Sequence, residues 1–353
     1  MTKYRIAYLM CTATVAATGL GAAAPPVAHR GVHVVWPDES IQKAVDAAKP
    51  GDTVLLAPGT FHQSVKISTP GLTLRGMGRA TVIEPGTKKD ANKCAEGGNG
   101  ICVVGTKDRN VEGVTVTSVT VTGFARTGVF SMATDGLTVQ NVTAVKNGVW
   151  GIAQERSVRG RFLDNFARDN GDAGLFLANT IQEEQGATDT EGTVIERNRL
   201  EGNRIGVTVR RLRNLVVGRN HLTGNCAAVF VVGDENKPKA GAVTVRDNYI
   251  AHNNKSCPKT PRLDALEGSG IVLTGVDDTL VTGNVVRGNV GKSPLSGGIV
   301  LFKSFVGVTS DRNRISDNVV EGNSPADLVN SDLGKDNTFL GNTCRASQPT
   351  GLC

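Results

Sequence analysis

The chain has 353 residues and a formal net charge of +6; 39% of its residues are hydrophobic, but only 4% are aromatic. This composition excludes a large aromatic core and favours a narrow core of Val, Ile and Leu. The mild positive charge favours acidic partners such as uronic-acid polymers. No run of about 18 apolar residues follows the N-terminus, so we expect no membrane span after it.

Residues 1–24 have the three parts of a secretory signal peptide. The basic segment MTKYR precedes an apolar core at residues 6–20, and residues 21–24 are small, as cleavage requires. We expect cleavage near Ala23, which leaves a secreted protein with one domain over residues 25–353. An N-terminal membrane anchor is the alternative interpretation of the same segment.

Six cysteines remain after the predicted cleavage, and an even number in an exported chain indicates disulfides. Proximity in the sequence favours the pairs Cys94–Cys102 and Cys344–Cys353, which leaves Cys226–Cys257. No CxxC motif or histidine cluster indicates a metal site, so we expect no metal and no other cofactor. A calcium requirement stays open, because no motif indicates one.

The first predicted elements are a strand over 32–37 and a helix over 38–49. Apolar residues recur at i, i+3, i+4 and i+7 from Ile41, and either Asp38 or Ser40 is suited to cap the helix. A short amphipathic helix before an array of strands suits an N-terminal cap, since the first coil would otherwise expose its core. The next predicted strands are 53–57, 64–67, 72–76 and 81–85.

The segment SIQKAVDAAKPGDTVLLAPGTF, followed by GLTLRGMG, resembles the opening of many right-handed β-helix proteins of the pectin lyase-like superfamily. This group includes pectate lyases, alginate epimerases and NosD-type periplasmic proteins. The later coils and the closing GNTCRASQPTGLC resemble secreted actinobacterial β-helix repeat proteins. The resemblance covers residues 32–353 and implies a fold more than an activity, because the superfamily shares architecture rather than chemistry.

Asparagine pairs spaced five residues apart independently indicate stacked coils. Residues 205–225 show one coil most clearly: a strand, a polar turn, a second strand closed by Asn220 and a third segment closed by Asn225. Asn tolerates the left-handed backbone of a sharp turn, and Asn amides stacked about 4.8 Å apart can bond along the axis. We therefore predict an all-β, right-handed parallel β-helix of roughly ten coils over residues 53–342, closed by a disulfide-bonded tail at 343–353. The pairs are Asn165/Asn170, Asn198/Asn203, Asn220/Asn225, Asn248/Asn253, Asn284/Asn289, Asn318/Asn323 and Asn337/Asn342.

Insertions into the coils all border the same strand of each coil. Loops on both sides of one long sheet make a groove, and loops on a rigid scaffold are the usual carriers of function. In this register Cys226 and Cys257 lie in equivalent turns of neighbouring coils, within reach of a disulfide that would hold the loop at residues 254–269. The insertions are residues 179–192, 233–241 and 303–313 after the strand, and 254–269 and 290–297 before it.

The alternation in residues 205–210 predicts which side chains face the groove. Ile205, Val207 and Val209 are expected inside, which leaves Gly206, Thr208 and Arg210 outside. The same register puts three aromatic side chains in one outer column, where they could stack on sugar rings or be buried by flanking loops. They are Phe130, Phe176 and Phe230.

Glu155 and Arg210 are the candidate catalytic pair on this face. They occupy one column two coils apart, about 10 Å, where Glu155 could act as base or acid and Arg210 could hold a carboxylate or sugar. Thr208, Asp234 and the three Phe are candidate substrate contacts. Alternatively, both charges bond to nearby loops, and Asp234 pairs with Arg210 or Arg211. A second carboxylate could come from Glu183, Glu184, Asp189 or Glu191.

The DPH motif of the superfamily's epimerases and the WxDH motif of its pectate lyases are both absent. These absences weigh against those two specific activities. From the export signal and the predicted groove, we expect a secreted, monomeric carbohydrate-active or carbohydrate-binding protein, of lyase, epimerase or hydrolase type if it is an enzyme. Its expected partner is a polysaccharide or cell-wall glycan and not a nucleic acid. The alternative is a non-catalytic extracellular or NosD-like accessory protein whose loops fill its groove.

Overall fold

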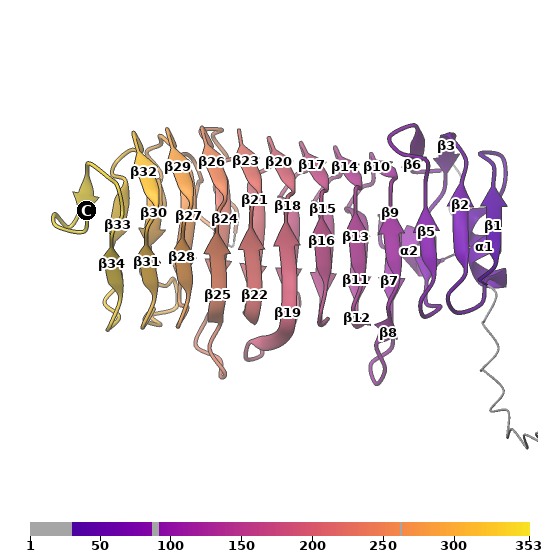
Figure 1. Ribbon diagram of the computed structural model, residues 1–353, viewed down its shortest axis with the longest axis horizontal. Coiled ribbons are helices and arrows are strands. Elements are labelled where there is room, and N and C mark those ends of the chain that lie inside the picture. Colours follow the sequence, from indigo (N-terminus) through magenta and orange to yellow (C-terminus); the bar gives the residue numbers. More distant parts are fainter. Residues whose placement is uncertain (1–29, 87–91, 262) are drawn as a thin grey trace, which may run out of the picture. The chain divides into compact units, whose positions relative to one another are not determined.

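The computed structural model describes residues 30–86, 92–261 and 263–353, so the predicted signal peptide at 1–24 lies outside the described residues. Gly31–Cys353 forms one compact unit. Its strands run parallel to their neighbours and stack coil upon coil, as Figure 1 shows. The predicted all-β parallel β-helix is confirmed.

Most coils contribute one short strand to each of three sheets, here called sheets A, B and C. Sheet A has 12 strands: β1 (Val32–Val35), β2 (Thr53–Leu56), β5 (Thr73–Arg75), β9 (Thr115–Thr117), β13 (Thr138–Gln140), β16 (Arg161–Leu163), β19 (Thr188–Glu196), β22 (Leu212–Gly218), β25 (Gly241–Arg246), β28 (Leu280–Thr282), β31 (Arg314–Ser316) and β34 (Thr338–Leu340). Sheet B has 10: β3 (Gly59–His62), β6 (Thr81–Glu84), β10 (Thr120–Thr122), β14 (Thr143–Val145), β17 (Phe166–Arg168), β20 (Arg199–Glu201), β23 (His221–Thr223), β26 (Tyr249–Ala251), β29 (Val285–Arg287) and β32 (Val319–Glu321).

Sheet C carries the longer strands that the predicted groove was expected to follow. Its 11 strands are β4 (Val65–Ile67), β7 (Asn99–Val104), β11 (Thr127–Met132), β15 (Trp150–Glu155), β18 (Ala173–Ala178), β21 (Ile205–Arg210), β24 (Ala227–Val232), β27 (Ser269–Thr274), β30 (Gly297–Leu301), β33 (Leu328–Asn330) and β35 (Ser347–Gln348). A separate pair joins β8 (Val111–Glu112) to β12 (Thr134–Asp135).

The predicted capping helix is present but shorter than expected, because residues 38–40 form the turn that leads into it. It is α1 (Ile41–Ala47), and the Ser40 side chain accepts a hydrogen bond from the backbone N–H of Lys43. Ile41 and Val45 are buried and pack into the core of the first coil. The cap therefore covers apolar surface that the first coil would otherwise expose. A second short helix, α2 (Lys93–Glu96), precedes β7.

The asparagines form ladders inside the turns, as their structural interpretation requires. Asn165 Nδ2 donates to Asn198 Oδ1 at 3.0 Å and to the carbonyl of Val139 at 2.9 Å, while the Asn165 backbone N–H donates to the same Oδ1. We predicted that the Asn itself would have the left-handed backbone. The positive φ instead falls on the residue before each Asn, for example Asp164 at 56°. This left-handed residue turns the chain so that the amide points inward and satisfies buried backbone groups.

The expected register is wrong at the start of the sheet C strands. Ile205 packs outside, with Cys226 and Phe230, whereas Val207 lies in the inner core as predicted. A Cβ built on Gly206 would meet Leu222 Cδ2 at 2.6 Å, so this glycine faces inward. The same Cβ would lie 2.6 Å from the carbonyl oxygen of Ala228 on the next coil, so the packing leaves no space for a side chain.

All three predicted disulfides are present. The Cα–Cα distances are 5.7 Å for Cys94–Cys102, 6.0 Å for Cys226–Cys257 and 5.4 Å for Cys344–Cys353. Disulfides are typical of proteins that fold outside the cytoplasm.

Candidate functional site

Loops cover the middle of sheet C and bury two of the three predicted aromatic contacts. Phe176 is 7% exposed and Phe230 is 5% exposed. Phe176 stacks on Trp150 with ring centroids 4.5 Å apart, and Ile181 and Leu266 from the flanking loops join the same apolar cluster. Of the two alternatives for this column, burial holds at Phe176 and Phe230, so these rings do not line an open groove.

Thr208 is buried and Asp234 is paired within the protein. Thr208 lies between Phe176 and Phe230 in the strand register and is 5% exposed. Asp234 forms an ion pair with Arg211, one of the two partners considered for it. Arg211 also donates to the carbonyl of Glu183 at 3.0 Å. These contacts hold the 179–192 and 233–241 loops against the sheet.

Both residues of the candidate catalytic pair bond to the backbone of one loop residue, Ile181. Glu155 Oε1 accepts a hydrogen bond from the backbone N–H of Ile181 at 3.2 Å, and Arg210 Nη1 donates to the Ile181 carbonyl at 3.4 Å. The predicted register, with Ala178 between them, is correct. Both residues therefore bond to a nearby loop, which was the alternative interpretation of the pair.

An open pocket of about 300 Å³ remains beside this loop, over β7, β11 and β15. Glu155 and the half-buried Phe130 both line it, so the structure brings together two of the predicted site residues. Arg210, Thr208, Phe176, Phe230 and Asp234 do not line it. The remaining lining residues are Asn99, Arg126, Met132, Arg156, Thr180, Ile181, Gln182 and Glu183.

Asn99 is the most informative residue of this pocket that the sequence did not indicate. It is 8% exposed, and its Oδ1 has no hydrogen-bond partner among the described residues. This oxygen is itself inaccessible to solvent, so other atoms of Asn99 line the pocket. The residue begins β7, outside the alternating strand positions from which the groove was predicted, so alternation along the strand did not indicate it.

The pocket combines two cations with two carboxylates. The Arg126 guanidinium lies 5.7 Å from the Trp150 ring centroid, and Arg156 lies beside Met132. Glu183, one of the acidic residues considered as a partner for Glu155, lines the same pocket. Both arginines sit in turns that flank sheet strands, which is why alternation along the strands did not select them. This set can bind a sugar hydroxyl, a carboxylate or both.

A half-buried acidic group, Asp172, lies 4.0 Å from Arg204 on the 254–269 side of the sheet. Burial raises the pKa of Asp172, whose carboxylate accepts from Trp150 Nε1 at 3.0 Å. Burial also lowers the pKa of Arg204, which donates to the carbonyls of Pro258 and Asp264. Together with the Cys226–Cys257 disulfide, Arg204 fixes this loop over the sheet.

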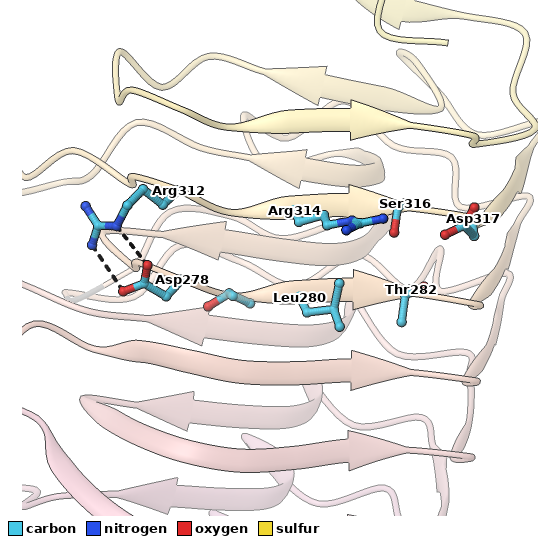
Figure 2. A pocket seen from close by; sticks show the side chains of 8 residues that line it. Asp278, Leu280, Thr282, Arg312, Arg314, Ser316 and Asp317 are labelled. Carbon is cyan, nitrogen blue, oxygen red and sulfur yellow. Dashed lines mark hydrogen bonds and ion pairs between the residues drawn. The ribbon is translucent and has the colours of Figure 1, made fainter.

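A larger hollow of about 450 Å³ lies on the outer face of sheet A, over β28 and β31 (Figure 2). Arg312 and Asp278 form a two-point ion pair at one end of it. This pairing neutralises both charges. The hollow is a shallow depression on the sheet surface, and its lining residues include no aromatic side chain. It is therefore not the candidate site.

Within the described ranges, no group of three or more His, Cys, Asp or Glu is placed to hold a metal ion. The same part of the chain contains no helix long and apolar enough to cross a membrane.

Two family models match the chain in succession. One, described as a right-handed beta helix region, matches residues 66–241, and one described as periplasmic copper-binding protein (NosD) matches residues 178–350. No curated protein matches the chain.

Several solved structures share this architecture. The mannuronan C-5 epimerase AlgE4 A-module of Azotobacter vinelandii has a TM-score of 0.55 at 16% identity, over 87% of this chain and 91% of that one. An alginate lyase from Paenibacillus sp. has a TM-score of 0.52 at 15% identity, over 81% and 94%. A DFA-IIIase from Arthrobacter chlorophenolicus has 0.52 at 13% identity, over 85% and 80%.

At such identities, the solved structures establish the fold and leave the activity open. One architecture accounts for the two family models, the three stacked parallel sheets and the asparagine ladders. The chain therefore folds as a right-handed parallel β-helix.

Proposed function

We propose that this is a secreted carbohydrate-active or carbohydrate-binding protein, and that it takes sugar residues in the pocket over β7, β11 and β15. The observation that carries the proposal is the convergence of Phe130, Glu155 and Asn99 in one cavity. A half-buried aromatic ring offers a face to the apolar side of a sugar, while the polar groups fix its hydroxyls.

In a turnover reaction, Glu155 is the proposed acid or base. Hydrolysis needs two carboxylates, and Glu183 of the 179–192 loop supplies the second. A lyase or epimerase needs one base and a cation that stabilises the developing negative charge, and Arg126 and Arg156 are the available cations. Arg210 takes a different role from the sugar clamp that the sequence suggested, because it holds the carbonyl of Ile181 and positions the loop.

The solved structures of similar fold support the carbohydrate proposal. They include an epimerase, an alginate lyase and a DFA-IIIase, which share this fold although their activities differ. The three disulfides and the NosD family model support export from the cytoplasm.

A non-catalytic accessory role is the second candidate. The covered rings of Phe176 and Phe230 favour it, since much of the face expected to hold a long substrate is filled by the protein's own loops. In this case the pocket binds a sugar without turnover.

The test is incubation of the mature protein with a panel of acidic and neutral polysaccharides and their oligosaccharides. Unsaturated products, new reducing ends and binding are scored separately. We expect binding or turnover of at least one ligand that Glu155→Gln and Asn99→Ala both weaken. Glu112→Gln, an exposed change outside the pocket, is the matched control. The absence of binding and turnover across the panel contradicts the proposal, whereas binding without turnover selects the accessory role.

A further inference from the structure

The outer face of sheet B carries a stripe of rings and guanidinium groups that the pocket does not use. Phe166, Arg199, His221 and Tyr249 occupy the first position of four successive strands, β17, β20, β23 and β26, and are direct neighbours in the register. The middle residues of these strands point into the core, where they are fully buried, so the first residues point outward. Figure 1 shows the four strands side by side.

Three arginines surround the Phe166 ring. The guanidinium carbons of Arg79, Arg168 and Arg199 lie 5.7, 5.6 and 5.5 Å from its centroid. A guanidinium that stacks on a ring keeps its in-plane N–H groups free to donate, in a geometry that matches a carboxylate. The cluster therefore presents ordered donors at the solvent-facing surface.

The charges of this cluster are only partly neutralised. Arg168 pairs with Asp169 at 3.2 Å, and Arg199 pairs with Glu201. Arg79 is exposed, and no carboxylate within the described ranges lies at ion-pairing distance from it. The stripe thus has an excess of positive charge at the Phe166 end.

The other end of the stripe is aromatic. His221 and Tyr249 stack with centroids 5.0 Å apart and planes 20° apart, and Tyr249 is 43% exposed. From Phe166 to Tyr249 the stripe crosses three strand spacings, about 14 Å along the axis. One strand spacing, about 4.8 Å, is close to the length of a pyranose ring in an extended chain, so successive sugars can meet successive strands.

We propose that this stripe is a second binding site, which holds a polyuronate chain along the axis of the β-helix. Uronate carboxylates pair with Arg79 and its neighbours at Phe166, and sugar faces lie on the ring of Tyr249. Charge complementarity selects an acidic glycan over a neutral one. The stripe lies on sheet B and the pocket on sheet C, so the stripe binds polymer whether or not the pocket turns it over.

The test is affinity electrophoresis of the mature protein in gels that contain polygalacturonate or a neutral glucan. We expect polygalacturonate to retard the wild type, with retardation that falls as salt is added, and the glucan to have no effect. Arg79→Ala and Tyr249→Ala should each raise the dissociation constant about fivefold. Arg75→Ala removes an exposed arginine of the same coil from sheet A, and Trp36→Ala removes another exposed aromatic residue; both controls should bind as the wild type does.

Two further arms separate this site from the pocket and from other occupants. Arg79→Ala and Tyr249→Ala should leave binding or turnover of oligosaccharides at the pocket at the wild-type level, so that failure of the stripe and failure of the pocket are distinguishable. Unchanged retardation of both stripe variants, with circular dichroism like that of the wild type, overturns the proposal. Equal retardation by the neutral glucan, or tighter binding of single-stranded nucleic acid than of polygalacturonate, overturns the assignment of a polyuronate.

Discussion

Glu155 and Arg210 both bond to the backbone of Ile181: Glu155 accepts from its N–H, and Arg210 donates to its carbonyl. Two charges on separate coils thereby fix the loop that walls the pocket. Glu155 contacts the pocket directly, whereas Arg210 acts through the loop.

Arg210→Ala is expected to loosen the 179–192 loop without unfolding the coils. The hydrogen bond to Ile181 is long, at 3.4 Å, so its loss alone should lower the free energy of unfolding by about 1 kcal/mol or less. Limited proteolysis within residues 181–186 should become faster, as measured by mass spectrometry. Arg314→Ala, on the exposed face of sheet A, should leave the cleavage rate unchanged. Equal cleavage of all three proteins would remove the positioning role of Arg210.

The asparagine ladder should be a main source of stability. Asn220→Ala removes the acceptor of both Asn198 bonds and the donor to Ile195, all of them buried. Because the partners stay buried and unpaired, the free energy of unfolding should fall by about 3 kcal/mol or more. Asn342→Ala, at the half-exposed last rung, should cost about 1 kcal/mol. Denaturant titration measures both, and equal losses would contradict the burial argument.

Asp52 should make the N-terminal cap sensitive to acid. The pKa of its carboxyl is lowered from 3.8 to about 2 by hydrogen bonds from the Lys49 backbone, the His33 side chain and the Gly31 backbone. The folded state binds this proton less tightly than the unfolded state. The stabilisation is therefore complete above about pH 4 and is lost as the pH falls toward 2.

Asp52→Asn should be less stable than the wild type at pH 6, and the difference should shrink between pH 4 and pH 2. Thermal unfolding across this range measures the effect. The exposed substitution Asp108→Asn should run parallel to the wild type. A constant difference between Asp52→Asn and the wild type at every pH would show that the carboxyl has an ordinary pKa.

The Cys226–Cys257 disulfide should hold the cover over Phe230. It closes a sequence separation of 31 residues, for which chain entropy predicts about 4 kcal/mol. The double variant Cys226→Ala/Cys257→Ala should lose up to that amount and should become sensitive to protease within residues 254–266. Arg204→Ala, which removes two bonds to the same loop, should show the same cleavage pattern with the disulfide intact. A protease-resistant loop in both variants would contradict the claim that the disulfide and Arg204 hold this loop over the sheet.

The sequence predicted the architecture well because its signals are local and repeated. Each asparagine of the repeat, such as Asn198 or Asn220, marks a turn. The pairing of Cys226 with Cys257 follows from the same register. The prediction failed at Ile205 and Gly206, since close packing against Leu222 and Ala228 leaves no space for a side chain at Gly206. It also could not decide whether Phe176 is covered, because that depends on how distant loops fold over the sheet.

The candidate site was only partly predictable for the same reason. Glu155 and Phe130 follow from alternation along a strand. Asn99, Arg126 and Arg156 lie at strand ends and in turns, and only the folded chain brings them to one cavity.

A titration of Trp150 fluorescence tests the central claim most directly. The chain has two tryptophans, so Trp36→Phe leaves Trp150 as the reporter, next to Arg126 at the edge of the pocket. Addition of the oligosaccharide that the panel identifies should shift the Trp150 emission in a saturable way. Glu155→Gln in the same background should weaken that binding about tenfold or more, which corresponds to about 1.4 kcal/mol. An emission that stays constant while the ligand binds, or an affinity unchanged by Glu155→Gln, would contradict a sugar site over β7, β11 and β15.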